Sequence, residues 1–226
     1  MTDLAGHGME YGVVEREPPH VLGDNLRIAA RLWSSSTVFL FFAFLFAYFY
    51  LRSLNEHHLW RPMHVDPSFT LGTLVAACVV GSAALLRLAV VHHRADELRE
   101  WRRKGGASLA LVVLAIVLQI VEWSTQGFGP TEGGYASVYL GWTAFEMLFL
   151  VGLLYWIETT LATSLRYRRE APAAFGTGEA SGDAHRSAPD IDDPLSLIRA
   201  ELGAVSFFAT ALAIVFAISW LVLYVL

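Results

Sequence analysis

The sequence predicts an all-α integral membrane protein, built as a bundle of five transmembrane helices. Two totals support this fold class: 55% of the 226 residues are hydrophobic, and the mean hydropathy is +0.47, which exceeds the values typical of soluble domains. In addition, the apolar residues fall into five long runs. Each run approaches the ~20 residues that a helix needs to cross the hydrocarbon core.

The N-terminal part of the chain does not have the pattern expected of a secretion signal. Residues 1–31 have no apolar core behind a basic start, so we expect no cleavable signal peptide and assign insertion to the first span. Cys78 is the single cysteine and lies within an apolar run. We therefore expect neither a disulfide nor a cysteine-based metal site within the chain.

The first membrane span follows a polar tail. Residues 1–26 are mixed in charge and include Pro18 and Pro19, which predicts a mostly irregular tail ahead of a membrane domain over residues 27–226. The first span is predicted over residues 33–51. Its crowded Phe and Tyr side chains favour a packing or lipid-facing surface over a ligand site.

A polar loop over residues 52–66 is expected after the first span. It contains His57, His58 and His64, which raises the question of a metal site. No thiolate accompanies these histidines and no pair of them has i,i+4 spacing. We therefore interpret the segment as a hydrated interfacial loop.

The second span is predicted over residues 68–90. Arg87 near its end is long enough to reach the headgroups. Small side chains in this span favour close helix contact; they are Gly72, Ala76, Ala77, Gly81 and Ala84.

Two further spans carry the polar residues of the membrane domain. The third, over residues 107–124, follows a short basic segment and contains Gln119, Glu122 and Trp123 near its end. The fourth, over residues 139–157, has Glu146 near its middle, and Glu158 follows directly. These five residues are the candidate structural, proton or lipid sites.

A flexible linker and the last span complete the chain. Residues 171–193 are rich in Ala, Gly, Ser, Pro and Asp without periodicity, which is typical of a segment that cannot bury a core. Asp193 as N-cap and Pro194 at the first helical position predict a helix start. That helix leads into the fifth span, over residues 203–226.

The distribution of Lys and Arg predicts the orientation of the bundle. Fourteen of these residues lie in the N-terminal tail and in the segments joining spans two to three and four to five, and only two lie on the other side. The positive-inside rule therefore places the N-terminus in the cytoplasm and the C-terminus outside.

The sequence contains no signature of a catalytic or redox centre. It lacks a glycine-rich phosphate loop, a nucleophile elbow and an HExxH pattern. The eight histidines lie outside the five spans; they are His7, His20, His57, His58, His64, His92, His93 and His185. We therefore expect no catalytic, cofactor-binding or metal-ligating residue in this chain.

The carboxyl groups at membrane depth allow two interpretations. Glu122, Glu146 and Glu158 could act as polar groups hydrogen-bonded between helices, or they could form a proton-accessible or lipid-headgroup site. Because an unpartnered acid facing lipid is costly, we expect the face of Glu146 to meet another helix. By depth, Ser82 or Thr210 is a better partner for it than Glu122.

Four groups of residues form a recognisable pattern along the chain. The groups are 40–50 (LFFAFLFAYFY), 119–123 (QIVEW), 134–145 (GYASVY, then TAF) and the last helix from 205 (VSFF) to 224. Together they resemble subunit III of the haem–copper oxidases in its five-helix bacterial form. The similarity covers residues 27–226 apart from 171–193.

The resemblance implies a non-catalytic subunit of a respiratory terminal oxidase in the bacterial plasma membrane. Such a subunit would stabilise catalytic subunit I, which holds the haems and copper, contact subunit II, bind phospholipid and support proton uptake. The pattern is divergent, because Val38 stands where the family has a glutamate and Glu146 and Phe149 stand where it has histidines. Only Gln119 and Glu122 match its polar signature.

Two alternatives remain open, the first suggested by this divergence and the second by the membrane carboxyl groups. One is an accessory subunit of a nitric oxide reductase-type complex. The other is a free-standing transporter that uses Glu146 and Glu158. Against a transporter, five spans give no even inverted repeat and no span is interrupted by proline.

Overall fold

The chain folds as an all-helical bundle in the computed structural model, which describes residues 19–54, 60–94, 98–174 and 194–226. The helices within these ranges are α1 Pro19–Ser53, α2 Phe69–Arg94, α3 Leu98–Thr125, α4 Gly134–Ala174 and α5 Pro194–Trp220, followed by the π-helical turn η1 Leu221–Val225. Five of these segments are long and apolar enough to cross a membrane. The predicted fold class is confirmed in this respect.

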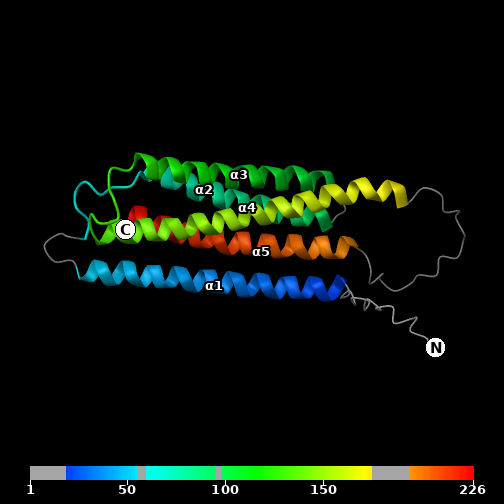
Figure 1. Ribbon diagram of the computed structural model, residues 1–226, viewed down its shortest axis with the longest axis horizontal. Coiled ribbons are helices and arrows are strands. Elements are labelled where there is room, and N and C mark those ends of the chain that lie inside the picture. The colour runs from blue at the N-terminus through cyan, green and yellow to red at the C-terminus, as the bar shows by residue number, and fades with distance from the viewer. Residues whose placement is uncertain (1–18, 55–59, 95–97, 175–193) are drawn as a thin grey trace, which may run out of the picture.

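The helices run side by side along one axis (Figure 1). α2 and α3 lie together at one side of the bundle, α1 lies at the other, and α4 and α5 lie between them. The ends of α1 and α3 and the starts of α2 and α4 share one end of the bundle with the C-terminus, which we call the C-terminal end. α4 and α5 therefore touch both outer layers.

Several helices are longer than the sequence predicts. α1 begins at Pro19, so the tail prediction is wrong for residues 19–26. These residues pack on α5, where a Cβ atom on Gly23 would lie 3.1 Å from the Cβ of Ala200. The helix therefore begins well before the apolar run. Residues 1–18 lie outside the part of the chain that the structure describes.

The same extension affects α3 and α4. Residues 98–104 are helical rather than part of a basic connection, because Leu, Arg, Glu and Lys are good helix formers. There Trp101 is buried together with Ile198 and Leu202. α4 continues to Ala174, so the linker prediction is wrong for residues 171–174, and residues 175–193 lie outside the described ranges.

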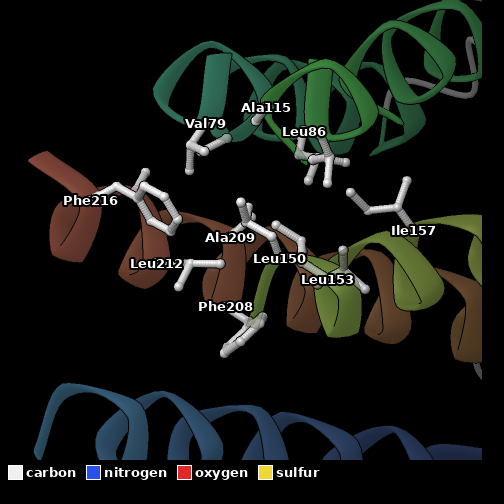
Figure 2. Close-up of a cluster of buried hydrophobic side chains, with 14 of the residues drawn as sticks. Val79, Leu86, Ala115, Leu150, Leu153, Ile157, Phe208, Ala209, Leu212 and Phe216 are labelled. Atoms are coloured by element: carbon white, nitrogen blue, oxygen red, sulfur yellow. The ribbon is translucent and has the colours of Figure 1, made fainter. Parts of the chain in front are cut away.

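The central core joins α2, α3, α4 and α5 (Figure 2). Leu150 and Leu153 of α4 point toward Leu212 of α5 and toward the α2–α3 pair. In the most apolar stretch of α5, 50% of the residues are buried within the chain, compared with 22% in the corresponding stretch of α1. α5 is therefore the central helix, while α1 is the most peripheral by this measure.

Small residues on α2 allow the close contacts that the sequence predicts. A Cβ atom on Gly81 would lie 3.3 Å from a methyl group of Leu111, and one on Gly72 would overlap the ring of Tyr224. Gly72 thus makes room for an aromatic side chain from the end of the chain. This contact borders the polar cluster described below.

Aromatic side chains close the C-terminal end of the bundle. The ring of Trp60 packs edge-on against Tyr48 and Tyr135, and the backbone N–H of Tyr135 donates to the carbonyl of Trp60 at 2.9 Å. The Arg61 guanidinium lies 4.5 Å from the centre of the Tyr135 ring. The loop after α1 is thereby attached to the start of α4.

The aromatic row of α1 faces away from the rest of the chain. Phe39 is 76% exposed, and several neighbouring aromatic residues are also exposed: Phe42, Phe46, Phe49 and Tyr50. In a membrane these side chains would meet lipid or another protein. This arrangement agrees with the predicted packing or lipid-facing surface.

Candidate functional site

A polar cluster lies inside the apolar bundle, where α3, α4 and the end of α5 meet. Its first member is Glu122, which is only 1% exposed. The hydroxyl of Tyr224 donates to the Glu122 carboxylate, with both oxygens at 2.9 Å. The amide nitrogen of Gln119 donates to Glu122 Oε2 at 3.2 Å. Glu122 is therefore a buried acid with its hydrogen bonds supplied by the protein.

The π-helical turn η1 brings Tyr224 into the cluster. The Tyr224 hydroxyl lies 3.2 Å from that of Tyr139, and the Tyr135 hydroxyl donates to the carbonyl of Leu223 at 2.5 Å. A π-helical turn is wider than an α-helical one and changes the direction of the side chains that follow. The last residues of the spanning helix are thereby fixed against α4.

Glu146 forms the second part of the cluster. It is 4% exposed, and its carboxyl group lies beside Ser219 and Trp142. The Trp142 indole donates to Ser219 Oγ at 2.7 Å, and Ser219 donates to the carbonyl of Val215 at 2.9 Å. The prediction that the face of Glu146 meets another helix is confirmed, and that helix is α5.

The predicted partners of Glu146 are wrong. Ser82 is hydrogen-bonded to Ser108 at 2.7 Å, joining α2 to α3. Thr210 accepts a bond from Arg87 at 2.9 Å and donates to the carbonyl of Ser206 at 2.7 Å. Both hydroxyls are thus engaged elsewhere, because similar depth does not place two side chains on facing helix surfaces.

The two acids belong to one polar region rather than to two separate ones. A small cavity is lined by the polar residues Gln119, Glu146, Ser219, Trp220 and Tyr224. Gln119 and Tyr224 are hydrogen-bonded to Glu122, so they connect it to the cavity that Glu146 faces. The described hydrogen bonds include none directly between Glu122 and Glu146, which agrees with the expectation that they are poor direct partners.

Two other predicted residues lie outside this cavity. The indole of Trp123 donates to Thr143 Oγ1 at 3.1 Å, which ties α3 to α4 beside the cluster. Glu158 is exposed on α4. The structure thus groups Gln119, Glu122 and Glu146, places Trp123 next to them, and leaves Glu158 apart.

Sequence reasoning missed the hydroxyl and indole groups that complete the cluster. Tyr224 and Ser219 look unremarkable in an apolar last helix, because Tyr is common near membrane interfaces. It also missed the bond from Thr160 Oγ1 to Glu201 at 2.8 Å, which joins α4 to α5 near the opposite end. The signal that could have found these residues is that each is a polar side chain within an apolar span.

A large apolar cleft lies between α1, α4 and α5. The space that the centre of a water molecule can occupy there is about 870 Å³. Trp33 packs edge-on against Phe149 and Phe208 on its wall, with ring centres 6.4 and 6.5 Å apart, and Tyr155 and Trp156 also line it. The cleft suits an apolar ligand.

A hydrogen bond between side chains connects two loops at the C-terminal end. His64 Nε2 lies 2.7 Å from Glu132 Oε2, and the backbone N–H of Gly129 donates to Glu132 Oε1 at 2.9 Å. The Gly129 N–H, and then His64, hold the pKa of Glu132 below its usual range. Among the described residues, no three His, Cys, Asp or Glu side chains are grouped for metal binding; His57 and His58 lie outside those residues.

Comparison with known proteins assigns no family. No protein-family model matches the sequence, and no curated protein matches it.

Proposed function

We propose that the chain is a non-catalytic subunit of a respiratory haem–copper terminal oxidase, similar to subunit III. The observation that carries this proposal is the order of the matching motifs along five spanning helices, with the QIVEW segment at residues 119–123. The location of Gln119 and Glu122 in the buried cluster supports it, because both match the polar signature of the family. Subunits I and II are the proposed partners.

In this proposal the haems and copper belong to catalytic subunit I. The present chain supplies helical surface that stabilises that subunit within the bilayer. The exposed aromatic row of α1 supports such a role, because aromatic side chains are enriched in the core of protein interfaces. The proposed location is the plasma membrane of a bacterium, with the N-terminus in the cytoplasm.

Lipid binding is the second part of the proposed function. The cleft between α1, α4 and α5 has apolar walls and a volume suited to acyl chains. Trp33 and Tyr155 on its wall combine an apolar ring with a polar tip. We therefore assign bound phospholipid to this cleft. Support of proton uptake, the third part, would depend on the cluster of Glu122 and Glu146.

The proposal is tested by removing the chain from its native membrane and then restoring it. Membranes that lack it should contain less assembled oxidase, measured as lower oxygen consumption and a weaker reduced-minus-oxidised haem spectrum. Expression of the intact chain from a plasmid should restore both. Unchanged oxygen consumption and haem content would contradict the proposal, and loss of nitric oxide reduction alone would favour the reductase alternative.

A further inference from the structure

The small cavity inside the polar cluster has the size of a water site. The space that the centre of a water molecule can occupy is about 10 Å³, at the lower end of the roughly 10–15 Å³ that a buried water requires. Gly72 and Ala76 of α2 form part of its wall and add little side-chain volume. The cavity therefore has room for one water and for little more.

One atom on the wall needs a hydrogen-bond partner. Glu146 Oε1 is buried and has none among the residues that the structure describes. A carboxyl oxygen without a partner in an apolar environment is destabilising, and natural proteins rarely leave such a group unsatisfied. The position of Glu146 on the wall indicates that its partner lies in the cavity.

Some polar groups around the cavity already have partners. The Ser219 hydroxyl accepts from Trp142 and donates to Val215, and the Trp220 indole donates to Thr73 Oγ1 at 2.9 Å. Gln119 and Tyr224 have further capacity, because an amide carries two N–H donors and a carbonyl, and a phenol oxygen also accepts. Together with Glu146 they provide the two to four polar contacts that a buried water makes.

We propose that this cavity binds a single water molecule, which hydrogen-bonds Glu146 Oε1 and bridges it to Gln119 or Tyr224. Water fits either protonation state of Glu146, because it donates to a carboxylate oxygen and accepts from a carboxylic acid. Since Gln119 and Tyr224 both bond to Glu122, the water joins the two acids into one network across α3, α4 and the end of α5.

The water site lies within this chain and would be the same in an oxidase subunit, a reductase subunit or a transporter. The water links Glu146 to Glu122, which lies 24 positions away in the sequence. Its test therefore uses direct observation of the site rather than enzymatic activity.

The experiment is a density map of the full chain, purified with whatever complex it forms, at a resolution that shows ordered water. A single peak within hydrogen-bond distance of Glu146 Oε1 and of Gln119 or Tyr224 is expected. An empty cavity in a map that shows other buried waters would overturn the proposal. So would a side chain or lipid filling the space, or a peak with the short contacts of a metal ion.

Two matched variants on α2 sharpen this test. Ala76 lines the cavity whereas Ala77, its neighbour, is exposed. Ala76→Val should fill the space and remove the peak, while Ala77→Val should keep it. If the water peak stays in the same place in Ala76→Val, the assignment of the site is overturned. If Ala76→Val fails to fold, the density map of the unmodified chain decides whether the cavity holds water.

Discussion

At the scale of residues, the polar cluster depends on a few hydrogen bonds made in an apolar environment. Glu122 receives bonds from Tyr224 and Gln119, and Ser219 connects Trp142 to α5. An ionisable group at membrane depth costs a few kcal/mol unless its neighbours satisfy it. The stability of the bundle should therefore respond to the loss of single hydroxyl or carboxyl groups in the cluster.

Tyr224→Phe removes one hydroxyl while keeping the ring that packs against Gly72. We expect the free energy of unfolding to fall by about 1–2 kcal/mol, because Glu122 loses a donor in an apolar site. Thermal unfolding of the purified protein in detergent measures this change. The control is Tyr155→Phe, since Tyr155 is 69% exposed; an equal or larger loss in the control would contradict the account.

Glu146→Gln should assemble normally and leave turnover of the complex nearly unchanged, because glutamine keeps the size and hydrogen-bonding capacity of the side chain. Glu146→Leu should weaken assembly more, by about 1 kcal/mol, since it abolishes the polar contacts with Ser219 and Trp142. The yield of complex and its turnover are the two measurements. Glu158→Leu, on the exposed side of α4, is the control and should have little effect.

A different pattern would assign Glu146 another role. If Glu146→Gln assembles fully but strongly reduces turnover or proton pumping, the side chain titrates during function. The interpretation of Glu146 as a structural hydrogen-bonding group would then be wrong.

The sequence could predict the acids of the cluster but only part of their surroundings. Glu122 and Glu146 stand out because carboxyl groups are rare in apolar spans, and the burial of the Glu146 face followed from helical geometry. The identity of its partners did not follow, because Ser82, Thr210 and Ser219 are equivalent by residue type. Which of them faces α4 depends on helix rotation, which is set by packing in the whole bundle.

At the scale of elements, the start of α4 is defined by two adjacent glycines. Gly133 has a φ of 133°, a backbone conformation that side chains disfavour. A Cβ atom on Gly134 would lie 2.9 Å from the Trp60 ring. The turn into α4 and the close contact with the preceding loop both require glycine.

Gly134→Ala should lower the free energy of unfolding by about 1–3 kcal/mol, because the new methyl group displaces the buried Trp60 ring. Gly152→Ala is a matched control on the same helix, since its added Cβ meets no other atom within 4 Å. That control should be neutral or stabilise the helix by up to about 1 kcal/mol. Denaturation of both variants provides the comparison, and equal losses would contradict the packing argument.

The contact between the two loops at the C-terminal end should depend on pH. The pKa of Glu132 is lowered in the folded protein, so its contribution to stability is present above its unfolded pKa of about 4.3. That contribution is lost as the pH falls through the lower folded value. Glu132→Gln should therefore unfold at a temperature closer to that of the wild type at pH 3 than at pH 7. A difference that does not shrink in acid would contradict this prediction.

Helix bounds were less predictable from sequence than helix number. Each apolar run marked a span, but α1, α3 and α4 continue into polar segments. Hydropathy reports where a helix enters lipid, whereas the helix itself ends where packing and propensity no longer support it. Trp101 illustrates this difference, because it is buried by α5 beyond the predicted third span.

At the scale of the whole molecule, the charge distribution predicts one orientation in the membrane. In a background with Cys78→Ala, a thiol introduced by Ser53→Cys should react with an impermeant reagent added outside the cell. One introduced by Ser181→Cys should react only after the membrane is opened, because fourteen of the sixteen Lys and Arg are predicted to lie on its side. The reverse pattern of labelling would contradict the predicted orientation.

We propose that the chain belongs to a haem–copper oxidase whose redox centres lie in other subunits. The most direct measurement is the absorbance spectrum of the tagged chain after mild purification from its native membrane, with an unrelated tagged membrane protein as the control. We expect a Soret band, copper, and oxygen reduction in the purified sample, together with a larger catalytic subunit. A haem-free oligomer of this chain alone would contradict the claim and favour a transporter.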